Sequence, residues 1–205
     1  MLLRLDFEIL ILLLPALVFS LCIHEFSHGY IAYILGDNTA ARNGRLTLNP
    51  MAHLDPIGSL MILFVGFGWA KPVPINFQAL RSPKSDMIWV ALAGPSANLI
   101  MAIGWLLIFF LATNMNILIL QRMADAGILI NILLAIFNLL PIPPLDGSRV
   151  ISALLPNPLA YKYNQLEQYG FVILIGLMWF GGFSYIVLPI VRLVLSWFRY
   201  FQALI

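Results

Sequence analysis

The sequence predicts an all-α polytopic membrane protein. Of its 205 residues, 61% are hydrophobic and only 10% are charged, and the mean hydropathy is +0.94. A soluble domain is closer to half apolar and a quarter charged, so this composition excludes an ordinary cytosolic protein. Several apolar stretches reach the length of roughly 20 residues that a helix needs to cross a bilayer. We therefore expect about four to six transmembrane helices, joined by short extended or re-entrant segments.

Four largely charge-free runs predict the spanning helices. The first starts at Ile9 and, after a polar interruption, ends at Leu35. The other three cover residues 87–121, 126–145 and 168–191. A shorter, glycine-rich run at 56–70 is marginal as a full crossing.

The N-terminus imitates a signal peptide, because Arg4 precedes an apolar run. No small-residue cleavage site follows before His24, so we expect a retained helix. The longest polar stretch is too short for a soluble domain, and residues 1–205 are expected to form a single membrane domain.

Basic residues predict the orientation, since lysine and arginine gather in cytoplasmic loops. The predicted loops on one side hold Arg42, Arg45, Lys71, Arg81, Lys84, Arg149 and Lys162. The opposite side holds Arg4 and Arg122. We therefore expect an outside N-terminus and a cytoplasmic region at 36–86. The formal net charge is only +2 and no basic cluster is dense, so no nucleic acid partner is expected.

The most informative residues interrupt the first apolar run, where His24, Glu25 and His28 form an HExxH motif. Positions four apart lie one turn apart on the same helix face, so the two imidazoles can share a zinc ion and Glu25 can reach its water. A carboxylate in a spanning helix costs on the order of 3 kcal/mol unless it is paired. The alternative is a satisfied polar network between helices without a metal.

A catalytic zinc needs a third protein ligand. Cys22 faces away from His24 on the helix, and a single cysteine excludes a multi-cysteine site. Asp146 ends a proline-rich run at 138–147, and broken helix at membrane depth is tolerated only against protein or a wet cavity. Held there, Asp146 could reach a metal, or it could be an interfacial aspartate without one. His53 could instead be the third ligand, a substrate or gate residue, or an ordinary loop residue.

Two amides, Asn98 and Asn138, are predicted at membrane depth. Each could contact a scissile carbonyl, its oxyanion or a substrate backbone, or could simply tie two helices together. Residues 45–48 alternate in polarity and 72–75 contain two prolines, so both predict short extended pieces.

Three motifs in order resemble the site-2 protease family of intramembrane zinc metalloproteases: HEFSH at 24–28, AGPSAN at 93–98 and NLLPIPPLDG at 138–147. Segments at 43–50, 53–56 and 69–76 also resemble its compact prokaryotic branch, which lacks a PDZ domain. The resemblance implies that His24, His28 and Asp146 bind one zinc per chain at a buried site and that Glu25 is the catalytic base.

The resemblance also implies an endopeptidase that hydrolyses peptide bonds in or near the transmembrane segments of membrane protein substrates. We expect it in a prokaryotic plasma membrane, with the active site nearer the cytoplasmic side. A substrate helix must unwind before cleavage, and the 45–48 or the 72–76 segment could receive it through main-chain hydrogen bonds.

Two other classes of protein could carry the same buried residues. A zinc or proton transporter would need a continuous polar path, but beyond the motif the spans supply mainly Asn98, Asn131 and Asn138. A catalytically silent membrane scaffold would usually have lost a ligand or the glutamate, and this chain retains all four residues. The sequence therefore favours a hydrolase.

Overall fold

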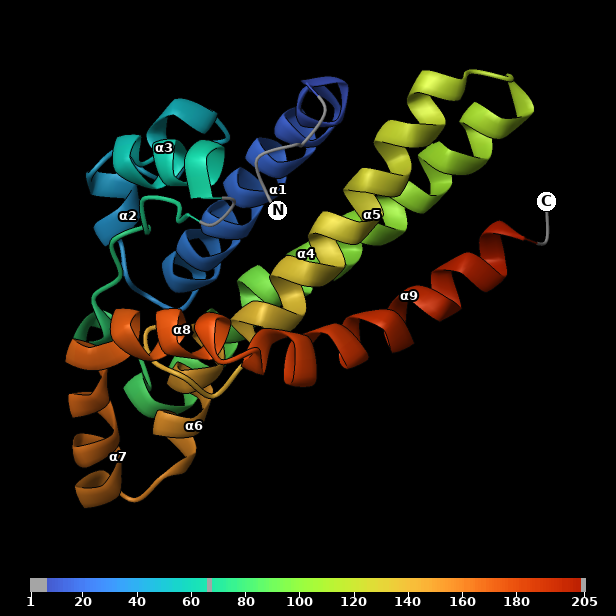
Figure 1. The fold of residues 1–205 in the computed structure, drawn as a ribbon. Coiled ribbons are helices and arrows are strands. Elements are labelled where there is room, and N and C mark those ends of the chain that lie inside the picture. Colours follow the sequence, from blue (N-terminus) through green and yellow to red (C-terminus); the bar gives the residue numbers. More distant parts are fainter. Residues whose placement is uncertain (1–6, 66–67, 204–205) are drawn as a thin grey trace.

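The computed structural model describes residues 7–65 and 68–203. All of the regular secondary-structure elements in this part of the chain are helices (Figure 1). The α-helices are α1 (Phe7–Ile34), α2 (Thr39–Arg42), α3 (Pro56–Val65), α4 (Pro83–Asn114), α5 (Leu118–Asn138), α6 (Asp146–Leu154), α7 (Asn157–Asn164), α8 (Gly170–Trp179) and α9 (Leu188–Gln202). Short 3-10 turns cover Pro50–Ala52, Phe77–Ala79 and Gln165–Tyr169, and a π-helical turn, Phe183–Val187, leads into α9. The predicted all-α membrane fold is confirmed.

Three of the described helical stretches are long and apolar enough to cross a membrane: Pro83–Asn114, Leu118–Asn138 and Phe183–Gln202. Helix α1 has 28 residues, but the side chains of 7–12 lie outside the described part. The prediction of four to six spans therefore stays a prediction.

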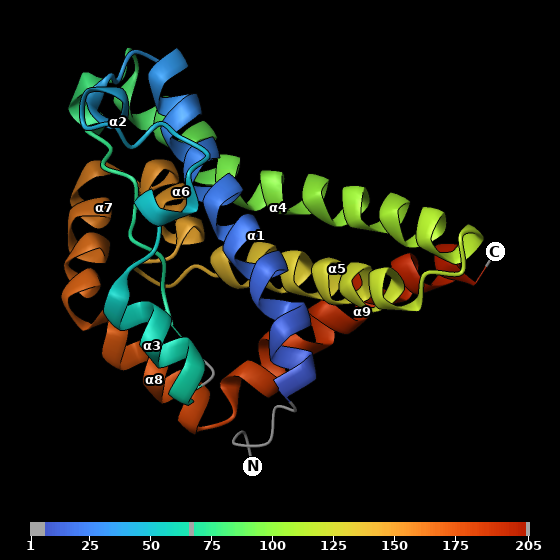
Figure 2. The ribbon, with the colours of Figure 1, turned by 90° about the horizontal axis from the view of Figure 1, so that it is seen from above.

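The long helices α4 and α5 form an antiparallel pair, and α9 runs beside them in both views (Figures 1 and 2). Small residues let α4 and α5 approach closely. Ala102 and Ala124 are fully buried, and a Cβ atom on Gly127 would collide with the ring of Trp105. Helix α1 crosses this pair and packs on both of its members (Figure 2). The crossing brings the HExxH face of α1 against α4.

The last charge-free run, residues 168–191, does not form one helix. Helix α8 ends at Trp179, and the chain turns at Gly181, whose φ of +76° favours glycine. The long helical stretch begins only at Phe183 and continues past the exposed Arg192. The glycine turn, rather than the charge pattern, sets where this stretch begins.

The segments that precede α4 are short and irregular. Helix α3 has only 10 residues, which agrees with the doubt about a full crossing at 56–70. Residues 71–76 have no regular secondary structure, and within the described residues the one β-bridge joins Leu54 to Ala70. The 45–48 and 72–75 segments are thus irregular, but neither belongs to a sheet.

Candidate metal centre

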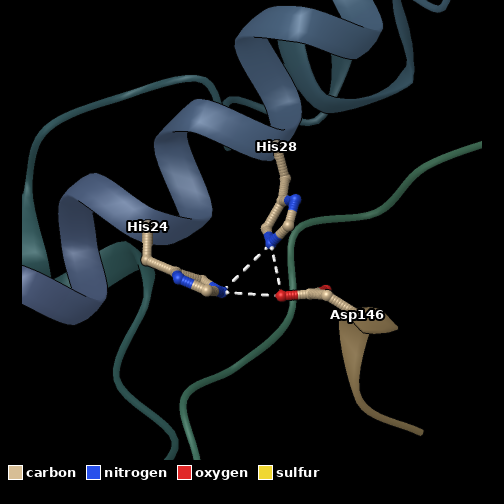
Figure 3. Close-up of side chains that lie close together, drawn as sticks. All are labelled: His24, His28 and Asp146. Carbon is tan, nitrogen blue, oxygen red and sulfur yellow. Dashed lines mark hydrogen bonds and ion pairs between the residues drawn. The ribbon is translucent and has the colours of Figure 1, made fainter. Parts of the chain in front are cut away.

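Two histidines of α1 and an aspartate of α6 converge on one point (Figure 3). The Nε2 atoms of His24 and His28 are 3.0 Å apart. Asp146 Oδ2 lies 3.2 Å from the first of these nitrogens and 3.3 Å from the second. Both histidines are buried, and one ligand atom from each of the three residues lies within 4.8 Å of the others.

The outer nitrogen of each imidazole is held by an acceptor on α4. His24 Nδ1 donates to Asn98 Oδ1 at 2.5 Å, and His28 Nδ1 donates to the carbonyl oxygen of Val90 at 2.7 Å. An amide oxygen and a backbone carbonyl only accept hydrogen bonds, so each Nδ1 carries a proton. The Nε2 atoms of both rings then face Asp146.

This donor set fits a zinc ion. Asp146 Oδ2 is buried and has no hydrogen-bond partner among the described residues. Together with the two imidazole Nε2 atoms it forms a group of three potential metal ligands, which a cation between them would stabilise. Two histidine nitrogens and one carboxylate oxygen are a typical ligand set of catalytic zinc, which keeps a fourth position open.

Helix α4 passes directly behind the two imidazoles at Gly94. A Cβ atom built on Gly94 would collide with Nε2 of both His24 and His28. A glycine in a membrane helix typically allows close helix packing. Here the side chains packed against it are the candidate ligands themselves.

Asp146 is positioned by the broken helix that the sequence predicted. Helix α5 ends at Asn138, and α6 begins with Asp146 after an irregular proline-rich turn that includes a cis peptide bond between Pro143 and Pro144. Tyr163 of α7 donates a hydrogen bond of 2.7 Å to the carbonyl oxygen of Pro141. Burial raises the pKa of the Tyr163 hydroxyl, so it remains a donor.

Glu25 lies in the same cavity as the three converging residues. The cavity has a volume of about 570 Å³ and is bounded by α1, α4, α6, the end of α5, α8 and the segment at 68–77. The N–H group of Val73 donates a hydrogen bond of 2.7 Å to Glu25 Oε2. The irregular segment therefore contacts the glutamate of the HExxH motif directly.

Side chains that sequence reasoning did not single out fix the 71–76 segment. Arg45 Nη2 donates to the carbonyl oxygens of Lys71 and Pro72, at 2.9 and 3.2 Å. The buried carboxylate of Asp37 accepts the N–H of Asn76 at 2.6 Å. The available sequence signal was Asp37 itself, which follows Gly36 in a turn and precedes Asn38.

The structure separates the other three predicted site residues. Asn138 lines the cavity, and its Nδ2 donates to the carbonyl oxygen of Leu134 at 2.9 Å. Asn98 is fully buried behind His24 and is not among the cavity-lining residues. His53 is also buried, and its Nε2 donates to the carbonyl oxygen of Thr47 at 2.8 Å. Of the two alternatives for a third ligand, the structure brings Asp146 rather than His53 to the α1 histidines.

Three contacts lie at the cavity wall near α8. Arg149 pairs with Glu167 at 2.6 Å and lies over the ring of Phe77, 5.7 Å from its centroid. Trp69 and Phe171 pack edge to face with centroids 5.8 Å apart. These pairs join the 68–77 segment to the region around α6 and α8.

The geometry of this site agrees with a zinc metallopeptidase, and comparisons with known proteins support that class. The model of peptidase family M50 matches residues 114–179. The putative zinc metalloprotease YwhC of Bacillus subtilis is 42% identical over 187 residues, 88% of this chain and 85% of the relative. The putative zinc metalloprotease Rip2 of Mycolicibacterium smegmatis is 30% identical over 178 residues, 83% of this chain and 67% of the relative. No solved structure matches the chain.

The chain therefore belongs to peptidase family M50, the site-2 protease family. Its cofactor is zinc, and the apolar helices agree with an integral membrane protein. The resemblance found in the sequence motifs is confirmed.

Proposed function

We propose that this protein is an intramembrane zinc endopeptidase that cleaves membrane protein substrates in or near their transmembrane segments. His24, His28 and Asp146 would bind one zinc ion, and Glu25 would be the general base. The observation that carries the proposal is the convergence of three ligand atoms beside a glutamate in one cavity. A transport path would not require a carboxylate held beside the ligands by a backbone amide.

Bound zinc would polarise the scissile carbonyl group and lower the pKa of the attacking water. Glu25 would take a proton from that water and deliver it to the departing amide nitrogen. Its Oε2 atom is already engaged by the Val73 N–H, so the proton would move through Oε1. The hydrogen bond to Val73 would keep the carboxylate oriented during both transfers.

We propose that the 72–76 segment, rather than 45–48, receives the unwound substrate. Val73 and Ile75 line the cavity, whereas residues 45–48 do not. Within the described part of the chain, no backbone hydrogen bond engages the N–H of Ile75 or the carbonyl oxygens of Val73 and Ile75. An extended substrate could pair with these groups as an added strand.

Asn138 would contact the substrate from the opposite wall of the cavity. One N–H of its amide is bound to the carbonyl of Leu134, which leaves the other N–H and the side-chain oxygen available. These groups could hold a substrate backbone or stabilise an oxyanion. Asn98 has no such access, and we assign it no direct contact with substrate.

We propose a bacterial plasma membrane location with the active site nearer the cytoplasmic side. The curated relatives come from bacteria, and the excess of basic residues lies in the loops at 36–86 and after α5.

The decisive experiment compares Glu25→Gln with the wild type for zinc content and for cleavage of a transmembrane reporter. We expect about one zinc per chain in both, and a loss of cleavage in the variant by at least about 100-fold. Asp125→Asn, on an exposed carboxylate of α5 that binds Gln202, is the matched control and should cleave normally. Retained cleavage in Glu25→Gln would show that another group is the base. Stoichiometric zinc without cleavage by the wild type would favour a transporter or scaffold.

A further inference from the structure

We propose that Asn131 of α5 is a positioning residue for zinc binding, acting through Asn98 on His24. Helix α5 supplies none of the three candidate ligands, but the side-chain amide of Asn131 would determine which nitrogen of His24 carries the proton. The inference rests on the proposed role of His24 as a ligand.

A row of hydrogen bonds connects α5 to His24. Asn131 Nδ2 donates to the carbonyl oxygen of Gly127 at 2.8 Å, and Asn98 Nδ2 donates to Asn131 Oδ1 at 2.9 Å. His24 Nδ1 then donates to Asn98 Oδ1 at 2.5 Å. Both amides are 0% exposed, so water does not compete for these bonds.

The donor-to-acceptor direction of these hydrogen bonds is fixed at Gly127, at the end of the row away from His24. The Gly127 carbonyl can only accept, so Asn131 must turn its NH₂ group toward it. Asn131 Oδ1 consequently faces Asn98 and requires a donor there. Asn98 then presents its oxygen to His24, which must carry a proton on Nδ1. At each step one amide orientation satisfies all the buried groups.

The two histidines differ in the kind of acceptor that keeps a proton on Nδ1. His28 Nδ1 binds the backbone carbonyl of Val90, which cannot exchange an acceptor for a donor. His24 binds a side-chain amide, which can rotate by half a turn and present NH₂ instead of oxygen. A rotated Asn98 would favour a proton on His24 Nε2, the atom directed at Asp146. Asn131 is the group that makes this rotation unfavourable.

Joining α4 to α5 does not by itself require this row of hydrogen bonds. Buried amides are costly unless they are hydrogen-bonded, and one interhelical bond would suffice to join α4 and α5. Here the bonds continue to an imidazole whose other nitrogen points into the metal centre. Partners that orient a metal-binding histidine in this way typically change metal affinity by about 10-fold to 100-fold when they are removed.

The first test is Asn131→Leu, which keeps the side-chain size and removes the acceptor for Asn98. Zinc affinity of the purified full-length chain in detergent is measured by competition with a chelator. We expect affinity to fall by about 10-fold to 100-fold. Ser20→Ala is the control, because Ser20 is a buried residue of α1 whose hydroxyl, among the described residues, bonds to the carbonyl of Ala16 alone. Its zinc affinity should not change, and an unchanged affinity in Asn131→Leu would overturn the proposal.

A second variant separates orientation from packing and from a folding defect. Asn98→Asp, added to Asn131→Leu, gives His24 a carboxylate that has only acceptors and cannot present a donor. We expect this double variant to recover most of the zinc affinity, which general damage at position 131 would not allow. Absence of recovery would overturn the proposal. His24→Ala separates a failure of the ligand assignment from a failure of this inference. If His24→Ala still binds zinc, His24 is not a ligand. If His24→Ala loses zinc while Asn131→Leu keeps its full zinc affinity, only the role of Asn131 is overturned.

Discussion

The N–H of Val73 donates a hydrogen bond of 2.7 Å to Glu25 Oε2. This bond joins the irregular segment on one wall of the cavity to the carboxylate next to the candidate ligands. Hydrogen bonds between its backbone and the side chains of Arg45 and Asp37 hold the same segment in place. The surface proposed to receive substrate and the proposed base are thus parts of one hydrogen-bonded unit.

Val73→Pro should lower kcat without lowering zinc content. Proline lacks the N–H that orients Glu25, and misplacement of a catalytic group by about 1 Å can cost on the order of 100-fold. Val73→Ala, which keeps the N–H, is the control and should retain most of the activity. Cleavage of a transmembrane reporter and metal analysis of the same samples give the two readouts. Equal losses in both variants would assign the effect to the side chain.

Gly94→Ala should abolish zinc binding although it adds a single methyl group. The new Cβ would occupy the space of the two imidazole Nε2 atoms, and the backbone of α4 cannot yield without disturbing its packing on α5. Gly104→Ala is a matched control on the same helix, because a Cβ there meets nothing within 4 Å. We expect Gly104→Ala to retain zinc and to gain up to about 1 kcal/mol in stability from helix propensity. Metal analysis and thermal unfolding of both variants check this, and zinc bound by Gly94→Ala would contradict it.

The parts of the site that the sequence predicted follow from local geometry. His24 and His28 share a face because four residues make about one helical turn, and the prolines before Asp146 make a regular helix impossible there. The parts it did not predict depend on how helices cross. That Gly94 lies against the imidazoles and that Asn98 points at His24 rather than into the cavity follow from the approach of α4 to α1. No spacing within either segment contains that information.

The break in the last charge-free run has a local cause. A charge-free run indicates where a helix can cross, but Gly181 and Gly182 interrupt the run at 168–191. Arg192 is exposed within the helical stretch that follows, so the charge did not end the helix. Hydropathy alone therefore does not locate where this helical stretch begins.

Asp37→Asn should weaken the anchoring of the 71–76 segment and raise KM more than it lowers kcat. The buried carboxylate accepts bonds from the Asn76 N–H, the Thr39 N–H and the Thr39 hydroxyl. An amide would turn a donor toward one of these donors, at a cost of about 1–3 kcal/mol in unfolding free energy. Asp55→Asn, whose carboxylate accepts the Gly58 N–H at the start of α3, serves as the control. Steady-state kinetics and thermal unfolding test the prediction, and an unchanged KM would contradict it.

Asp146→Asn should bind zinc weakly and yet fold at least as stably as the metal-free wild type. In the metal-free wild type the Asp146 carboxylate lies against the Nε2 atoms of His24 and His28, and an asparagine NH₂ at position 146 could donate a hydrogen bond to them. Zinc at 100 times its dissociation constant should stabilise the wild type by about 2.7 kcal/mol, and chelation should remove that gain. The variant should show little response to either treatment.

Asp86→Asn, on a buried carboxylate that accepts the Ser82 N–H at the start of α4, controls for the loss of a buried charge and should still respond to zinc. Thermal unfolding with and without zinc separates these outcomes, and a zinc response in Asp146→Asn equal to that of the wild type would exclude Asp146 as a ligand.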